Sequence, residues 1–217
     1  MNLVVLGATG GTGRLVVEQA LAAGHTVTAL VRSPEKLATS QPNLRVVTGS
    51  ATDVESVAGA MEGADAVIST LGGGGSVIAD STAAIVAAAR QAGVRRVIVL
   101  SSWLVERDRM STLLRLASGV AMGGLIKDKS AGEKLLRQSD LDWTIVYAST
   151  LGDGPATGST ILPEGANWSM SQRISRADVA TRLIESATSS QHGDRIVRIT
   201  GGTSTKETIQ PGAVTLE

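Results

Sequence analysis

Glycines at positions 7, 10 and 13 stand between an apolar run, residues 3–6, and a helical pattern that starts at Arg14. Without a Cβ atom, a glycine turn lets the backbone approach a pyrophosphate and lets the helix pack tightly on the strand. The helix N-terminus adds unpaired N–H groups and a partial positive charge. A glycine-rich loop without a ligand is the alternative, but the strand–turn–helix context favours phosphate binding. The predicted contacts are Gly7, Ala8, Thr9, Gly10, Gly11, Thr12 and Gly13.

The end of the second predicted strand, residues 26–31, indicates which dinucleotide this turn would bind. An acidic residue at this place would bind the ribose hydroxyls of NAD. The chain has Arg32 and Ser33 there instead. A guanidinium suits a 2′-phosphate and can stack on adenine, and the serine adds a hydroxyl donor. We therefore expect NADP(H) as the cofactor, with a surface arginine at the sheet edge as the alternative.

The glycine spacing of residues 7–13 resembles that of the short-chain dehydrogenase/reductase superfamily. More narrowly, it resembles the atypical, NmrA-like NAD(P)-binding group that includes biliverdin and flavin reductases. Residues 129–146 resemble the helix–turn–strand of that family, and residues 174–180 resemble its Ile-Ser-Arg-x-Asp-Val-Ala segment. We interpret the polar residues of the latter segment as structural. The likeness extends to about Gly201 and implies a Rossmann-type fold.

The resemblance assigns catalytic roles to Ser102 and Lys129. In short-chain reductases a serine at this strand end hydrogen-bonds the substrate carbonyl, which favours Ser102 and leaves Ser101 nearer the nicotinamide. Lys129 falls on the lysine of the Tyr-x-x-x-Lys pair and would hold the nicotinamide ribose; a solvated helix lysine is the alternative. The tyrosine position, one helical turn earlier, is Leu125, which cannot donate a proton.

The resemblance also places cofactor contacts after other strands. Ser50 and Ala51 would adjoin the adenine, although relatives usually carry Asp where Ser50 stands. Backbone after two later strands would line the ribose, the pyrophosphate and the nicotinamide carboxamide. These positions are Leu71, Gly72, Gly73, Tyr147, Ala148 and Ser149. For Tyr147, a buried strand position is favoured over a relocated proton donor.

Apolar side chains outside the regular pattern predict the wall of the substrate site. Residues 103–124 are expected to form a loop with a helical piece over the carboxyl end of the sheet, and residues 148–170 a long loop. Flexible apolar side chains suit a flat, hydrophobic ligand. The candidates are Trp103, Leu104, Met110, Met122, Leu151 and Trp168.

The elements that position these residues alternate between strand and helix. Further strands are predicted at residues 44–47, 66–70, 97–100, 143–147 and 195–199, and helices at 54–61, 79–92, 126–138 and 175–187. This alternation predicts an α/β fold, a single Rossmann-type doubly wound parallel sheet with helices on both faces, and a small substrate lobe from C-terminal loops. In such sheets ligands bind at the carboxyl ends of the strands. We expect one NAD(P)-binding domain over residues 1–202 and a disordered tail over 203–217.

Composition excludes several function classes. The 217 residues carry a net charge of zero and no cysteine, so neither nucleic-acid binding nor thiolate chemistry is expected. Two isolated histidines do not suggest a metal site. No apolar run is long enough for a bilayer, so we expect a cytoplasmic protein, as a monomer or dimer, with a small hydrophobic or aromatic substrate and no membrane partner.

These observations predict an NADPH-dependent reductase that passes hydride to a flat conjugated acceptor, such as a flavin, a quinone or a bilin-like molecule. The missing tyrosine favours acceptors that need no positioned acid. Two alternatives are a non-catalytic NADP(H)-binding redox sensor of the NmrA type and a redox-neutral isomerase or epimerase.

Overall fold

The computed structural model describes residues 1–37, 41–73, 75–189 and 195–202, apart from the Leu114 side chain. Its main sheet has eight strands in the order β3-β2-β1-β4-β5-β6-β10-β8. The first seven run parallel, and β8 pairs antiparallel with β10. Their bounds are β1 (Asn2–Leu6), β2 (Thr26–Val31), β3 (Leu44–Thr48), β4 (Ala66–Ser69), β5 (Arg96–Ser102), β6 (Asp142–Ala148), β8 (Ser159–Ile161) and β10 (Arg195–Gly201).

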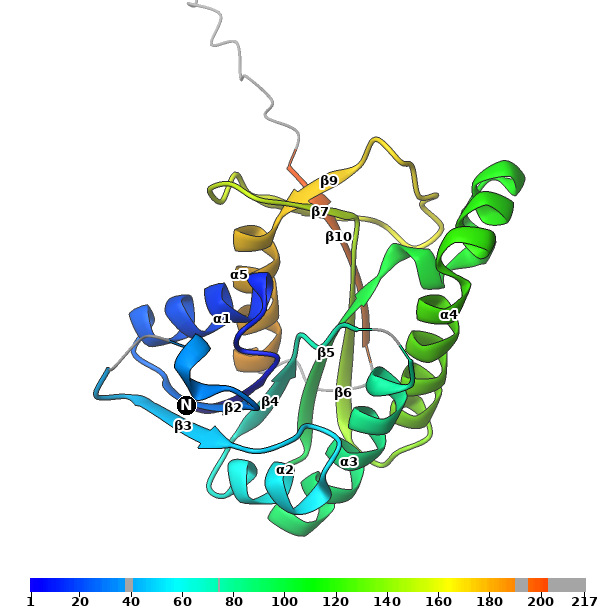
Figure 1. Ribbon diagram of the computed structural model, residues 1–217. Helices are drawn as coiled ribbons and strands as arrows, with labels where there is room; N and C mark the ends of the chain where they lie inside the picture. The colour runs from blue at the N-terminus through cyan, green and yellow to red at the C-terminus, as the bar shows by residue number, and fades with distance from the viewer. Residues whose placement is uncertain (38–40, 74, 190–194, 203–217) are drawn as a thin grey trace, which may run out of the picture.

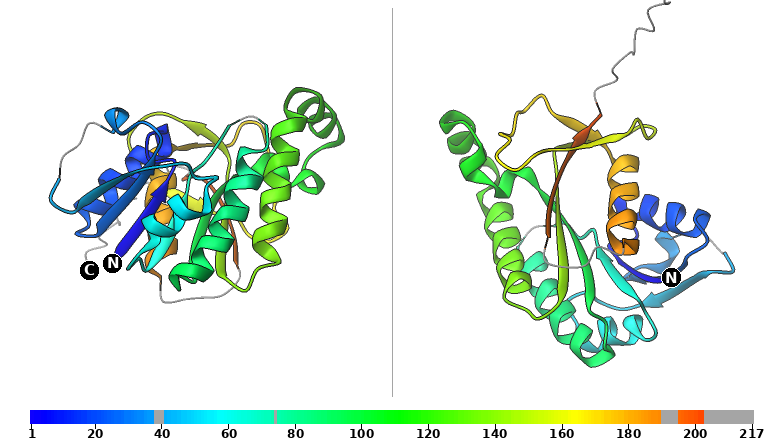
Figure 2. Two further views of the ribbon diagram at one scale, coloured as in Figure 1. Left: turned by 60° about the horizontal axis from the view of Figure 1, so that its bottom comes forward. Right: turned by 180° about the vertical axis from the view of Figure 1, so that it is seen from behind.

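Helices cover both faces of this sheet (Figures 1 and 2). The pair α1 (Gly11–Ala22) and α5 (Arg176–Thr188) covers one face, and α2 (Val54–Met61), α3 (Val77–Ala92) and α4 (Thr112–Arg137) cover the other. The arrangement confirms the predicted doubly wound α/β fold. The helix start expected at residue 54 and the helix end expected at residue 92 are also present. Asp53 caps α2 by accepting from Ser56 N, and Gly93 ends α3 with φ 71°.

Alternation along β1 explains why the sheet needs a helical layer on each side. Leu3 and Val5 belong to the apolar cluster under α1 and α5, whereas Val4 and Leu6 belong to the cluster under α2, α3 and α4. Successive side chains of a strand point to opposite faces, so a strand of four apolar residues is buried on both. Because these strands run parallel, the carboxyl ends of β1, β4, β5 and β6 lie at the same edge of the sheet. We call the two apolar clusters, one on each face of the sheet, the double core.

The chain departs from the expected pattern after β5. Two short 3₁₀ turns, Trp103–Val105 and Arg107–Arg109, lead into α4, which begins at Thr112 and kinks at Met122 (φ −131°, ψ 17°). The sequence predicted the second half of α4 as a helix, and only a loop with a helical piece for the first half. Within the expected loop of residues 148–170 lie β8 and β7 (Thr150–Gly152), and β7 pairs with β9 (Arg173–Ser175) in a separate two-stranded sheet.

The expected tail, residues 203–217, lies outside the described residues, so the domain boundary remains a prediction. Among the helices that the structure describes, none combines the length and apolar character needed to cross a bilayer.

Candidate active site

The turn between β1 and α1 is built by close backbone packing. Gly7 has φ +83°, which favours glycine, and its carbonyl accepts from Gly10 N at 2.9 Å. A Cβ atom on Gly13 would lie 2.1 Å from Gly7 O, so no other residue fits there without backbone movement. Gly10 is the N-cap of α1, and the first helical turn has neither a side-chain cap nor an acidic residue. These features fit a pyrophosphate at the helix N-terminus.

A cavity of about 820 Å³ opens from this turn across the carboxyl ends of the strands. Its floor includes the α1 N-terminus and the ends of β4, β5 and β6, and its far wall is α4. Several predicted residues share it, from both the cofactor set and the substrate wall. They are Gly10, Gly11, Thr12, Leu71, Gly72, Gly73, Ser101, Ser102, Trp103, Leu104, Met122, Lys129, Ala148, Ser149 and Leu151.

A second cavity, of about 280 Å³, lies beside the turn at the end of β2. Exposed Arg32 lines it, opposite Ser50 and Ala51. It shares Gly10, Leu71 and Gly72 with the large cavity. The two cavities thus lie on either side of the glycine turn and form one continuous path. This path suits an extended dinucleotide with its phosphates at the turn. The other predicted contacts, Gly7 and Thr9, line the second cavity, whereas Ala8, Gly13 and Ser33 line neither.

Leu125 and Lys129 both line the large cavity, one helical turn apart on α4. Lys129 Nζ lies 3.4 Å from Leu100 O. Burial lowers the pKa of Lys129, and the nearby charges of Glu133 and Asp128 partly oppose that effect. Lys129 is therefore a cavity side chain rather than a solvated surface lysine.

The two serines that end β5 also line the cavity, and each has a protein partner. Ser101 Oγ donates to Glu133 Oε1 at 2.5 Å, and Ser102 Oγ accepts from Leu104 N at 3.3 Å. Ser101 is buried, whereas Ser102 is half-buried. The end of β5 thus places two hydroxyl groups on the cavity wall.

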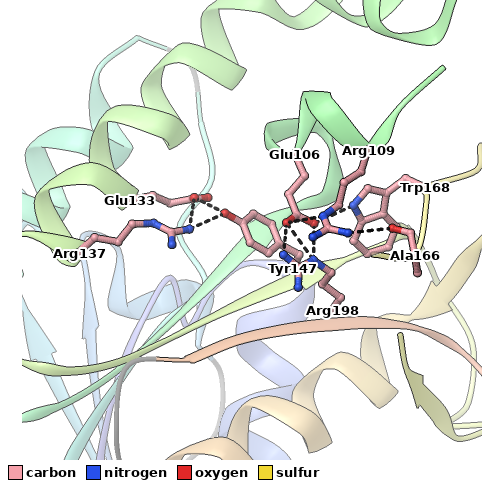
Figure 3. Close-up of polar contacts among 8 residues, drawn as sticks. All are labelled: Glu106, Arg109, Glu133, Arg137, Tyr147, Ala166, Trp168 and Arg198. Carbon is pink, nitrogen blue, oxygen red and sulfur yellow. Dashed lines mark hydrogen bonds and ion pairs between the residues drawn. The ribbon is translucent and has the colours of Figure 1, made fainter. Parts of the chain in front are cut away.

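Tyr147 does not contribute its side chain to either cavity. Its ring is buried on the α4 side of the sheet, and its hydroxyl donates to Glu133 while Arg137 Nη2 lies 3.0 Å from it (Figure 3). Burial, and then the Glu133 carboxylate, raise the pKa of Tyr147 far above its usual value. Tyr147 is thus a buried strand residue beneath the site, in an environment that favours its protonated form.

A second polar cluster is centred on Glu106 (Figure 3). Glu106 Oε1 lies 2.5 Å from Arg198 Nη2, and Glu106 Oε2 accepts from Trp168 Nε1 at 2.8 Å. The Trp168 ring in turn lies 6.3 Å from that of Trp103, which lines the cavity. Trp168 is therefore a support of the wall, and neither Trp168 nor Met110 lines the cavity.

Arg176 was interpreted from the sequence as structural, but it also lines the large cavity, from the first turn of α5. A Cβ atom on Gly11 would lie 3.1 Å from Cδ of Arg176, so the guanidinium lies over the glycine turn. Arg176 also forms an ion pair with Asp153 at 2.5 Å. A positive side chain beside a phosphate site has clear chemical value. Only the packing of α5 against α1, distant in sequence, reveals it.

Residues 7–190 match the protein family described as NAD(P)H-binding. This chain belongs to that family. An uncharacterized chloroplastic protein of Arabidopsis thaliana is 32% identical over 214 residues, covering 91% of this chain and 76% of the relative. The uncharacterized sugar epimerase YhfK of Bacillus subtilis is 30% identical over 216 residues, covering 93% and 95%.

Among solved structures, the anaerobillin reductase ChuY of Escherichia coli O157:H7 is similar, with a TM-score of 0.77 and 26% identity over 98% of this chain and 100% of that one. The family resemblance expected from the glycine turn is thereby confirmed. The cofactor is NAD(P)H, and the chain is an oxidoreductase with a reductase-like fold.

Proposed function

We propose that this protein is an NADPH-dependent reductase that passes hydride to a flat, conjugated, largely apolar acceptor. The observation that carries the proposal is Leu125, which lines the large cavity one turn before Lys129. An apolar side chain there replaces the acid that carbonyl reduction uses in the resembling family. Acceptors that spread negative charge over a ring system, such as flavins, quinones or bilin-like molecules, need that acid least.

The residues present fit the cofactor in both halves of the path. Backbone N–H groups of the turn and the Arg176 guanidinium would bind the pyrophosphate, and Arg32 with Ser33 would bind a 2′-phosphate. Ser50 and Ala51 would adjoin the adenine. Lys129 would hold the nicotinamide ribose, beside Ser101 and the backbone of Tyr147, Ala148 and Ser149. When bound, the cofactor supplies the hydride, and the protein supplies orientation.

The chain's own contribution to the reaction is a mostly apolar wall. Trp103, Leu104 and Leu151 face the cavity, and such side chains bind a flat ring and exclude water. Ser102 can hydrogen-bond a carbonyl oxygen of the acceptor. A positioned acid typically contributes about 100- to 10,000-fold in rate, so simple ketones should be poor substrates here.

Steady-state NADPH oxidation tests the proposal with two classes of acceptor. Flavin mononucleotide or a quinone should be reduced far better than aliphatic ketones. Leu125→Tyr should raise ketone reduction by installing the missing acid, whereas Leu125→Phe, with the same ring and no hydroxyl, should not. Efficient ketone reduction by the wild type that Tyr147→Phe abolishes would refute the proposal, because it would reveal a relocated acid.

A redox-neutral epimerase is the second candidate, favoured by the likeness to the Bacillus subtilis sugar epimerase. A mostly apolar wall suits a sugar poorly, which is why we place it second. Substrate epimerisation without net NADPH consumption would establish it. Tight NADP(H) binding with no turnover of any acceptor would instead favour the redox-sensor alternative.

Three further parts of the proposal concern the whole chain. Residues 1–202 act as one NAD(P)-binding domain, located in the cytoplasm, as a monomer or dimer. Limited proteolysis, cell fractionation and light scattering test them in that order.

A further inference from the structure

Glu133 is a buried carboxylate directly beneath the cavity wall. It is 7% exposed, and three donors are directed at it. Ser101 Oγ donates to Oε1 at 2.5 Å. The Tyr147 hydroxyl donates to Oε2, and Arg137 Nη2 lies 3.4 Å from Oε2 (Figure 3). A carboxylate accepts hydrogen bonds and donates none, and each of these three partners is a donor.

Other charged and polar side chains surround Glu133. Arg137 lies one turn further along α4, and Lys129 lies one turn earlier and faces the cavity. From β6, Tyr147 presents a hydroxyl that keeps its proton. Asp128 lies on the same helix, but its carboxylate accepts from the N–H groups of Ile78 and Ala79 at the start of α3.

The bond to Glu133 fixes what Ser101 can offer to the cavity. A serine hydroxyl has one hydrogen and two lone pairs, and the Ser101 hydrogen is committed to Glu133. Within the described part of the chain, no group donates to Ser101 Oγ. Toward the cavity, which Ser101 lines, its oxygen is therefore a hydrogen-bond acceptor.

Ser102 has the opposite polarity. Its oxygen accepts from Leu104 N at 3.3 Å, and among the described residues its hydroxyl hydrogen has no acceptor. Ser102 can therefore donate into the cavity. The end of β5 thus presents one acceptor and one donor, on successive residues.

We propose that Glu133 acts through Ser101 as a positioning residue, and that the site takes a ligand carrying an amide-type N–H beside its carbonyl group. This inference rests on the proposed reductase function and narrows its acceptor class. Rings with a lactam or imide, as in flavins and bilin-like molecules, carry an N–H that can donate to Ser101. A quinone has carbonyl groups but no N–H and leaves Ser101 without a partner. The carboxamide of the nicotinamide has the same chemistry as the lactam, so it is the second possible source of the N–H.

Two pairs of ligands that differ only at the N–H group distinguish these sources. In the first, the protein saturated with NADP⁺ is titrated with lumiflavin and with 3-methyl-lumiflavin, and flavin fluorescence gives each Kd. In the second, calorimetry compares NADP⁺ with its 3-acetylpyridine analogue, which has a methyl group in place of the amide nitrogen. The pair whose N–H donates to Ser101 should show a difference in Kd. In that pair, the ligand without the N–H should bind about 5- to 10-fold more weakly, because one hydrogen bond is lost.

Variants identify the residues responsible. The measured quantity is the affinity ratio, the affinity for the ligand with the N–H divided by the affinity for its partner without it. Ser101→Ala removes only the oxygen, so this ratio should fall to about 1. Glu133→Gln can donate its amide N–H to Ser101 and release the serine hydrogen toward the cavity, so the ratio should fall to 1 or below. Tyr147→Phe keeps the bond between Ser101 and Glu133, and the ratio should persist. Melting temperatures report folding, and Ser101→Ala decides alone if Glu133→Gln does not fold.

A ratio near 1 for both ligand pairs in the wild type would overturn the inference, as would a ratio that survives Ser101→Ala. A folded Glu133→Gln variant with the wild-type ratio would remove the role of Glu133. These binding experiments are independent of turnover. The NADPH assay can refute the reductase proposal while the binding data still show the N–H preference. Equally, the binding data can refute the N–H preference while the NADPH assay still shows reductase activity.

Discussion

Two glycines of the first turn should respond to substitution in opposite ways. Gly13 lies inside α1, where an added Cβ would sit 2.1 Å from Gly7 O, 2.7 Å from Gly7 C and 2.8 Å from Thr70 Oγ1. Gly10 has φ −80°, which any residue adopts, and a Cβ there meets only Gly7 O, at 3.3 Å. Gly13→Ala should therefore strain the fold, and Gly10→Val should fill the space for the phosphates instead.

The expected sizes follow from these contacts. Overpacking against rigid backbone costs about 1–3 kcal/mol, and for a chain of this length each kcal/mol lowers the melting temperature by about 2–4 °C. Gly13→Ala should thus lower it by about 2–12 °C. Gly10 stands at a helix N-cap on the cavity, so Gly10→Val should stay within about 1–2 kcal/mol of wild type yet lose most of its affinity for NADP(H).

Thermal unfolding by circular dichroism and calorimetric titration with NADP⁺ measure both quantities on the same samples. Gly59, a helical glycine whose added Cβ meets nothing within 4 Å, supplies the matched control as Gly59→Ala. It should change neither quantity adversely. Normal NADP⁺ binding by a folded Gly10→Val variant would refute the reasoning, because it would show that the phosphates lie elsewhere. An unchanged melting temperature for Gly13→Ala would show that the turn can relax.

Two further predictions concern single charges. Arg32→Ala should weaken NADPH binding by about 1.5 kcal/mol, the lower end for a charged hydrogen bond because the side chain is exposed, and leave NADH binding unchanged; equal wild-type affinities by calorimetry would contradict it. Burial opposes ionisation of Asp178, but hydrogen bonds from Ser175, Thr157 and Gly158 outweigh it and lower its pKa below the ordinary 3.8. Because the folded pKa lies below the unfolded one, this stabilisation is present above about pH 4 and is lost as pH falls through the folded value. Urea unfolding at pH 7 and pH 3 should therefore show a smaller acid loss in Asp178→Asn than in wild type, and an equal loss would contradict it.

Local signals made part of this structure predictable. Helix α2 has the predicted bounds because Asp53 caps its start and apolar residues recur at helical spacing. Leu125 and Lys129 share the cavity wall because residues four apart lie on one helix face. Where the chain alternates regular strands and helices, the order of the sheet follows from general rules of connection.

The remainder depends on contacts between distant segments. Strands β7, β8 and β9 are three residues each, too short for a period to show, and they form only against partners elsewhere in the chain. Because of three glycines, at positions 119, 123 and 124, the first half of α4 was expected to be a loop with only a helical piece, since glycine disfavours helices. The burial of Glu133 depends on β5 and β6, whose Ser101 and Tyr147 side chains contact it.

The kink of α4 at Met122 separates two helical segments that differ in how they pack. The segment after it packs on the core, whereas the segment before it carries exposed apolar side chains on its outer side: Leu113, Leu116 and Val120. That outer segment still supplies cavity-lining residues, Ala117, Ser118 and Ala121. Substitutions of weakly buried residues generally change stability by less than about 0.5 kcal/mol. Exposed Ala117 and Ala121 are thus positions at which ligand preference can be redesigned while the double core beneath the sheet retains its stability.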